Sequence, residues 1–210
     1  MANGVLGILG AGELGQQIAE IARVSHGVDR MVFFDDTCEP GSRIGEHTVL
    51  GGMDAVPAAL DAGDIHEVIL GIGFKHFGFR ASLAETGADW PWATLIGEGC
   101  ILSPSATVGP GCVLYPGTIL DRQVQLGPHN VLNLRTTVSH DCRLGPNNFL
   151  APSTTLSGFV EMGHSNFLGT GTVVSSRITL GSGNVFGAGS IIVRDFGDGV
   201  KAYGNPAKEA

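Results

Sequence analysis

The sequence has few charged residues, few basic ones and no long apolar run. Only 15% of its 210 residues are charged, and 12 Lys and Arg against 20 Asp and Glu give a formal net charge of −8. This balance argues against nucleic-acid or polybasic membrane surfaces, which need clustered basic side chains. No apolar stretch is long enough to span a bilayer, and no secretory signal pattern opens the chain. We expect a cytoplasmic protein without membrane insertion and without a nucleic-acid partner.

Cysteine is scarce as well. The cysteines form no CxxC pair and no zinc pattern, which argues for reduced thiols and against a metal site. They are Cys38, Cys100, Cys112 and Cys142. Hydrophobic residues make up 43% of the chain, which is enough for a core.

Glycine is abundant: 33 of the 210 residues are glycine, about 16% of the chain, whereas a typical protein has about 7%. From Ile96 to Ile192, every sixth residue is apolar, without a slip or an insertion. A second column, two residues before each of these, holds small or short side chains. This period predicts a parallel β-helix of hexapeptide repeats, in which three hexads make one triangular coil of 18 residues.

The 18-residue period is also visible in single residue types. Asparagine, glycine and hydroxyl residues recur at this spacing: Asn130, Asn148, Asn166 and Asn184; Gly109, Gly127, Gly145, Gly163 and Gly181; Thr118, Thr136, Thr154, Thr172 and Ser190. We expect one corner of the prism to stack amides that hydrogen-bond along the axis, and another to stack hydroxyls. Cys100, Cys112 and Cys142 fall in the small inward column, so we interpret them as core residues.

The first third of the chain follows a different pattern. A short apolar run ends at Leu9, and a glycine turn, a helical apolar spacing and a second apolar run from Met31 to Phe34 follow. Strand, glycine turn, helix, strand and acid is the order that a dinucleotide fingerprint requires, with phosphate at the helix N-terminus. The fingerprint residues are Gly10, Gly12, Gly15, Asp35 and Asp36. About 90 residues hold only one mononucleotide-sized half of such a fold, which favours a nucleotide-diphosphate ligand over NAD.

A further predicted strand, from Glu67 to Ile72, ends in the glycine turn at Gly73. Because Gly73 and Lys75 follow this strand, we expect both to contact the nucleotide.

These patterns together resemble the bacterial sugar acyltransferases that join a small nucleotide-binding α/β domain to a left-handed β-helix. The family includes sialic acid O-acetyltransferases and nucleotide-amino-sugar N-acetyltransferases. The resemblance rests on Gly10-Ala11-Gly12-Glu13-Leu14-Gly15, Asp35-Asp36, Gly71-Ile72-Gly73 with Arg80, Asn133, His140-Asp141 and Gly204-Asn205-Pro206-Ala207-Lys208. It implies an N-terminal α/β Rossmann-like half domain (1–92), a left-handed parallel β-helix (96–196) and a tail that covers CoA (197–210).

The resemblance also implies an activity typical of polysaccharide biosynthesis. Members transfer an acetyl group from acetyl-CoA, here to the amino group of a nucleotide-linked amino-deoxy sugar, and form homotrimers with active sites between subunits. The implied general base is His140, Asp141 orients its imidazole, and Gly158 offers a main-chain N–H to the thioester. Asn133 is implied at the acceptor sugar. The implied CoA-binding residues are Gly158, Ser176, Ala188, Arg194, Pro206 and Lys208.

The residue pattern supports this chemistry independently. An amine that attacks a thioester must lose a proton, and a histidine can accept it near neutral pH. At the 18-residue spacing, His140 is followed by Gly158, Ser176 and Arg194, so Gly158 leaves room for a ligand above the base. An extended CoA arm along this column meets Arg194. No serine or cysteine carries the signature of a covalent intermediate.

Two positions depart from the family pattern. The usual glycine-glycine-histidine centre of the N-terminal turn is Gly12-Glu13-Leu14 here, which places a glutamate near a diphosphate. Members often carry a second histidine nine residues after the base, where this chain has Phe149. The contribution of that histidine to acceptor binding is therefore missing or replaced.

Other functions stay open at this point. A sugar O-acetyltransferase of the sialic acid type would use the same base and donor, and a non-catalytic nucleotide-sugar-binding protein would need no base. A β-helix metalloenzyme of the γ-class carbonic anhydrase type would need three converging imidazoles. His129, His140 and His164 fall at three different phases of the 18-residue period, which argues against such a site.

Overall fold

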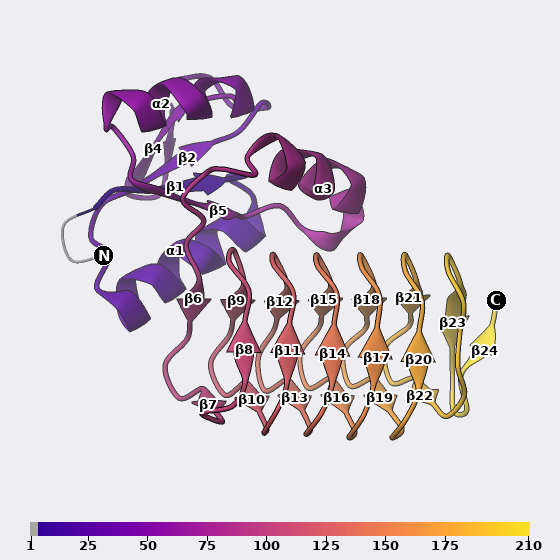
Figure 1. Cartoon of the computed structure of the whole chain (residues 1–210). Coiled ribbons are helices and arrows are strands. Elements are labelled where there is room, and N and C mark those ends of the chain that lie inside the picture. Colours follow the sequence, from indigo (N-terminus) through magenta and orange to yellow (C-terminus); the bar gives the residue numbers. More distant parts are fainter. Residues whose placement is uncertain (1–3) are drawn as a thin grey trace. The chain divides into compact units, whose positions relative to one another are not determined.

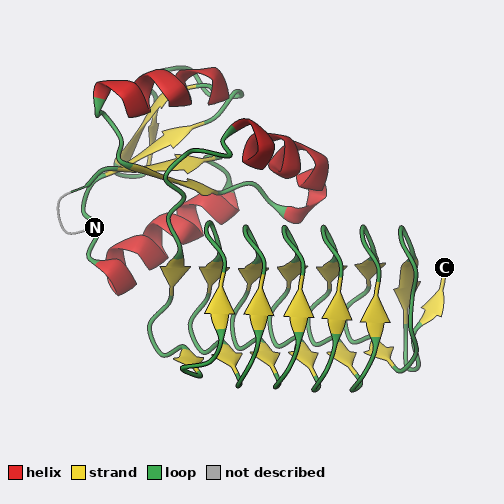
Figure 2. Cartoon of the chain, viewed as in Figure 1, coloured by secondary structure: helices red, strands yellow, loops and turns green. Residues whose placement is uncertain are grey.

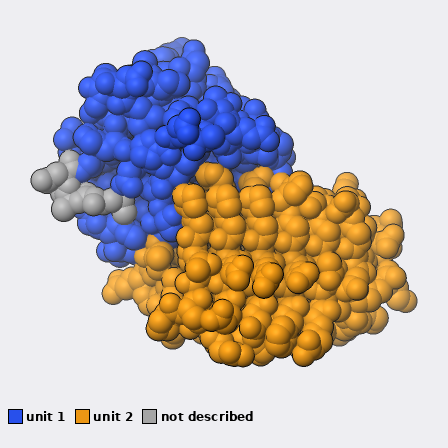
Figure 3. Space-filling view, viewed as in Figure 1, with its two compact units in different colours: residues 1–95 blue, residues 96–210 orange. Residues whose placement is uncertain are grey.

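The computed structural model describes residues 4–210 and divides into two compact units, with the boundary between Leu95 and Ile96 (Figure 3). The first unit combines helices with a sheet, and the second is a stack of short strands joined by turns (Figures 1 and 2). None of the helices within residues 4–210 combines the length and apolar character that a membrane span needs.

A five-stranded sheet in the order β3-β4-β2-β1-β5 forms the centre of the first unit. Four of its strands run parallel, and β3 pairs antiparallel with β4. The strands are β1 Leu6–Leu9, β2 Met31–Phe34, β3 Arg43–Ile44, β4 His47–Gly51 and β5 Glu67–Leu70. The helices are α1 Glu13–His26, α2 Val56–Ala62 and α3 Phe77–Thr86, with 3-10 turns η1 Met53–Ala55 and η2 Phe74–His76 before the last two. All four residues of β1 are buried, as its continuous apolar run predicts for a central parallel strand.

The glycine turn between β1 and α1 depends on close packing. Gly10 has φ +112°, and a Cβ at Gly15 would collide with the carbonyl oxygen of Gly10. Only glycine lets the first turn of α1 approach the end of β1 this closely. Gly12, in contrast, has no heavy atom within 4 Å of the position a Cβ would take.

The second unit is a parallel β-helix with three sheets (Figure 1). Each coil adds one short strand, usually of two residues, to each sheet. The first sheet holds β7 Ile101–Leu102, β10 Ile119–Leu120, β13 Thr137–Val138, β16 Thr155–Leu156, β19 Val173–Val174 and β22 Ile191–Ile192. The second holds β8 Thr107–Val108, β11 Gln125–Leu126, β14 Arg143–Leu144, β17 Glu161–Met162 and β20 Thr179–Leu180. The third holds β6 Leu95–Ile96, β9 Val113–Leu114, β12 Val131–Leu132, β15 Phe149–Leu150, β18 Phe167–Leu168, β21 Val185–Phe186, β23 Lys201–Tyr203 and β24 Lys208–Glu209.

The strand register confirms the predicted coil length. Ile119 of β10 lies opposite Ile101 of β7 and Thr137 of β13, a spacing of 18 residues on each side. The predicted apolar column fills the prism, and its buried members include Leu114, Leu132, Leu150, Leu156, Leu168, Val174 and Ile192. Residues of the second predicted column are buried in the same core, among them Cys112, Val124, Cys142, Val160 and Ile178.

The predicted asparagine corner forms a ladder of buried amides. Asn148 and Asn166 each donate their main-chain N–H to the Oδ1 of the asparagine one coil below, at 2.8 and 2.9 Å. Asn184 continues the ladder with a 2.9 Å bond to Asn166. The interpretation of Cys112 and Cys142 as core residues is also confirmed, because both are fully buried.

The last residues close the end of the β-helix. β23 pairs with β21 in parallel, and β24 folds back antiparallel onto β23. Ala202 and Ala207 of this segment belong to the buried core of the β-helix. The C-terminal segment therefore covers apolar side chains of the last coil.

Candidate active site

The turn between β13 and β14 carries His140 and Asp141, the predicted catalytic pair. His140 Nδ1 lies 2.8 Å from Asp141 Oδ2. A carboxylate can only accept, so Nδ1 donates the proton and the neutral ring presents its lone pair at Nε2. The His140 side chain is 40% exposed, and its Nε2 has no hydrogen-bond partner within residues 4–210. The ring is thus held in the tautomer that a general base needs.

Asp141 is fixed from the coil below. Its main-chain N–H donates to the carbonyl oxygen of Arg122 at 3.0 Å, and its φ of +59° lies in the left-handed region. Asp141 Oδ2, which accepts from the imidazole, also lies 3.3 Å from Nη2 of Arg122. One carboxylate oxygen therefore serves both the histidine and the arginine.

Gly158 lies against the His140 ring from the coil above. A Cβ built at position 158 would come within 2.6 Å of His140 Cε1 and 2.8 Å of Nε2. The Gly158 carbonyl accepts from the N–H of Arg177 at 3.0 Å, whereas its own N–H has no acceptor within residues 4–210. A side chain at position 158 would therefore displace the His140 ring from this place, and the Gly158 N–H remains a main-chain donor without an acceptor.

Two further side chains border this site, and sequence reasoning missed both. The Phe159 ring stands at 89° to the imidazole of His140, with 5.1 Å between centroids. The Arg177 guanidinium carbon lies 4.3 Å from the Phe159 centroid. Asp141, Phe159 and Arg177 are spaced by 18 residues, so the coil period could have identified this column.

The residues predicted for CoA are spread over the upper coils and the tail. Ser176, Ala188, Pro206 and Lys208 are all exposed. Arg194 contacts the tail, because its Nη2 lies 3.6 Å from Glu209 Oε1. Its guanidinium also packs over the Phe196 ring at 4.7 Å.

In the first unit, Asp35 holds the glycine turn. Its Oδ2 accepts the N–H of Ala11 at 2.8 Å, and its Oδ1 accepts the N–H and hydroxyl of Thr37 at 2.9 and 2.6 Å. Partial burial raises the pKa of Asp35, but the bonds from Thr37 and Ala11 outweigh it and lower the pKa below its ordinary value. Asp35 therefore ties the end of β2 to the predicted phosphate turn.

The other predicted acceptor residues are placed as follows. Asp36 Oδ1 accepts the N–H of Met53 at 2.8 Å. Gly73 precedes η2, and Lys75 within η2 is exposed. Asn133, in the turn before β13, accepts the N–H of Leu134 on its Oδ1 at 2.7 Å.

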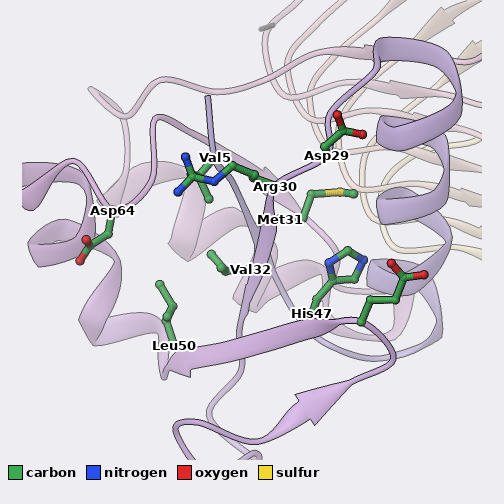
Figure 4. Close-up of a pocket in the computed structure, with 9 residues that line it drawn as sticks. Val5, Asp29, Arg30, Met31, Val32, His47, Leu50 and Asp64 are labelled. Atoms are coloured by element: carbon green, nitrogen blue, oxygen red, sulfur yellow. The ribbon is translucent and has the colours of Figure 1, made fainter. Parts of the chain in front are cut away.

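A pocket of about 460 Å³ in the first unit, shown in Figure 4, is lined by none of these residues. Asp29 and Arg30 precede β2, Asp64 precedes β5, and His47 begins β4, so the pocket lies at the amino ends of parallel strands. Ligands of parallel α/β sheets bind at the carboxyl ends, where the glycine turn lies. In the part of the chain that the structure describes, no three His, Cys, Asp or Glu residues gather as a metal site.

Comparisons with known proteins gave matches among solved structures. Models of protein families and curated proteins gave no match. The acetyltransferase domain of PglB from Neisseria gonorrhoeae, in complex with acetyl coenzyme A, is 30% identical with a TM-score of 0.90, over 99% of this chain and 100% of that chain. PerB from Caulobacter crescentus, in complex with CoA and GDP-perosamine, is 30% identical with a TM-score of 0.88, over 100% of this chain and 98% of that chain. WeeI from Acinetobacter baumannii, at 21% identity and a TM-score of 0.87 over 98% of this chain and 99% of that chain, shows a likeness of fold alone.

The likeness to the first two proteins spans both units, so it covers the glycine turn as well as the coils around His140. Full coverage at this level of identity shows a shared family. The chain therefore belongs to the bacterial sugar acetyltransferase family and is an acyltransferase.

Proposed function

We propose that the chain transfers an acetyl group from acetyl-CoA to the amino group of a nucleotide-linked amino-deoxy sugar, with His140 as general base. The observation that carries this proposal is the His140 imidazole resting on Gly158, with Nδ1 bonded to Asp141 and Nε2 open. PerB in complex with CoA and GDP-perosamine, and the PglB domain in complex with acetyl coenzyme A, support the choice of substrates.

The proposed reaction is a direct transfer. The amine nitrogen bonds to the thioester carbonyl carbon while Nε2 of His140 takes its proton, and the carboxylate of Asp141 stabilises the imidazolium. The open N–H of Gly158 donates to the oxyanion, an interaction worth about 3 kcal/mol in comparable sites. The C–S bond then breaks, and the imidazolium gives its proton to the sulfur, which leaves free CoA and the amide.

The remaining predicted residues bind the two substrates in this proposal. The acceptor would contact Gly10, Gly12, Gly15, Asp35, Asp36, Gly73, Lys75 and Asn133. Acetyl-CoA would contact Gly158, Ser176, Ala188, Arg194, Pro206 and Lys208, with residues 197–210 as a cover. We also propose that residues 1–92 are a Rossmann-like half domain, that the β-helix of residues 96–196 is left-handed, and that a cytoplasmic homotrimer forms the sites between subunits.

A thiol-release assay tests the reaction. Acetyl-CoA is offered with UDP-, dTDP- and GDP-linked 3-amino and 4-amino sugars, and His140→Ala serves as the control. Turnover that the variant loses establishes the reaction class, the acceptor and the base together. Nucleotide binding without turnover of any amine would favour a hydroxyl acceptor or a non-catalytic binding protein instead.

A further inference from the structure

Phe159 is an unusual residue for its position in the fold. Its φ of +61° lies in the left-handed region, where a bulky side chain is strained and short polar side chains are tolerated. Within residues 4–210, the other non-glycine residues with positive φ are all polar or charged: Gln123, His129, Arg135, Asp141, Asn147, Ser153, Ser165 and Arg177. Backbone preference therefore does not explain a phenylalanine at this turn.

Burial in the core does not explain it either. Phe159 remains 38% exposed, and it is absent from the apolar core of the β-helix. Its ring instead meets His140 edge to face at 5.1 Å, and Arg177 covers the ring at 4.3 Å. The side chain is thus held between the base and a cation from the next coil.

We propose that Phe159, seated by Arg177, is a positioning residue that fixes the plane of the His140 imidazole. Three contacts then define the ring: Asp141 holds Nδ1, Gly158 lies against its face, and the Phe159 ring blocks rotation. The Phe159 N–H also donates to the carbonyl oxygen of His140 at 3.1 Å, which links the two turns. Nε2 is the ring nitrogen that these contacts leave open.

The inference rests on the proposed role of His140 as the base. Without the Phe159 ring, the imidazole can turn about its side-chain torsions, and Nε2 spends less time in line with the amine. Misplacement of a catalytic group by about 1 Å lowers rates on the order of 10²-fold. We expect the loss in kcat, because Phe159 is not among the residues proposed to bind either substrate.

The decisive variant is Phe159→Asn. Asparagine favours the left-handed conformation, so the variant should fold at least as well as the parent, with an equal or higher Tm. We expect kcat to fall by about 10-fold to 100-fold, while KM for both substrates stays within about threefold. Phe159→Tyr keeps the ring and should restore most of kcat, and Arg177→Met, which unseats the ring, should give an intermediate loss.

The ring can also be followed directly. With 15N- and 13C-labelled histidine, the Hε1 resonance of His140 is assigned by its loss in His140→Ala. We expect this resonance to move in Phe159→Asn, because the ring current of Phe159 disappears, and to stay in place in the control Gln123→Asn. Gln123 occupies an equivalent left-handed turn in the same column and is exposed.

The outcomes separate the two proposals. If His140→Ala loses turnover while Phe159→Asn keeps both its kcat and its His140 resonance, the positioning role of Phe159 is wrong and the base assignment stands. If His140→Ala keeps turnover, the proposed base itself is wrong. A lower Tm with an unchanged kcat in Phe159→Asn and Phe159→Tyr would show a purely structural role for the ring.

Discussion

Gly158 lies so close to the imidazole of His140 that any side chain at position 158 would occupy the space of the ring. We expect Gly158→Ala to displace the ring and to lower kcat on the order of 10²-fold. Gly158→Val should in addition raise KM for acetyl-CoA, because its larger side chain reaches into the proposed thioester site. Steady-state kinetics test both effects. Gly78→Ala on α3, where a Cβ meets no atom within 4 Å, is the control and should keep parental kinetics.

The His140 and Asp141 pair predicts a graded response. His140→Ala removes the proton acceptor and should lower kcat by about 10²-fold to 10⁴-fold, with little change in the Kd of the acceptor. Asp141→Asn should lower kcat less, because its amide oxygen can still accept from Nδ1 although it stabilises the imidazolium poorly. Parallel measurement of kcat and acceptor Kd in both variants tests this order. A larger loss in Asp141→Asn than in His140→Ala would contradict it.

Asp35 predicts a dependence of folding stability on pH. Its pKa in the folded chain is lowered, so its carboxylate stabilises the fold above the ordinary pKa of about 4, and this contribution is lost as pH falls through the folded pKa. Asp35→Asn should lower the free energy of unfolding at pH 7 on the order of 1 kcal/mol, since charged hydrogen bonds are replaced by weaker neutral ones.

Urea unfolding at pH 7 and in acid measures this effect. The difference between the parent and Asp35→Asn should shrink as the pH falls below about 4. Asp61→Asn, on an exposed residue of α2, should leave the pH profile unchanged. A constant difference at every pH would show that the charge of Asp35 contributes nothing to the fold.

The asparagine ladder predicts a large stability loss from one buried residue. Asn166 is fully buried, and its Nδ2 donates to Asn148 Oδ1 and to the Gly181 carbonyl, each at 2.9 Å. Asn166→Ala leaves the Gly181 carbonyl and the Asn184 N–H without these partners, so unfolding should become easier by about 2–5 kcal/mol. Thermal unfolding tests this loss. The control Gln125→Ala removes an exposed, outward amide from β11 and should change stability by less than about 1 kcal/mol.

The sequence predicts the buried residues of this protein better than the contacts between its exposed side chains. The six-residue apolar column and the recurring asparagines correspond to the buried core and the amide ladder, because a closed prism tolerates only certain residues at inward positions. In the same way, the sequence predicts β2, the strand after α1, because a strand beside β1 in the buried sheet must be apolar.

Contacts between outward side chains are harder to predict. Arg177 packs on Phe159 although both side chains remain partly exposed, so no burial rule predicts their contact. The Asp35 side chain accepts the main-chain N–H of Ala11, which the side chain of residue 11 does not reveal. Nothing in the sequence pattern requires arginine instead of lysine at position 177. An acid after β2 can accept a hydrogen bond from a ribose hydroxyl or from a main-chain N–H. Only the folded structure distinguishes these uses.

Arg194, which we propose to bind CoA, already forms an ion pair with Glu209. Its ion pair with Glu209 is exposed on both sides, at 59% and 61%, so it should contribute only about 0–1 kcal/mol to stability. If Arg194 binds a phosphate of CoA, Arg194→Ala should weaken CoA binding by about 10-fold, the value of one charge-assisted bond. Glu209→Gln frees the guanidinium and should leave the CoA Kd equal or lower.

Calorimetric titration with CoA, together with Tm, separates this role from a structural one. An Arg194→Ala variant with an unchanged CoA Kd and a lower Tm would show that the arginine anchors β24 through Phe196 and Glu209. In that case Glu209→Gln should lower Tm as well, since both variants break the same ion pair. Weaker CoA binding in Arg194→Ala alone, with both Tm values near that of the parent, would place a phosphate at this guanidinium.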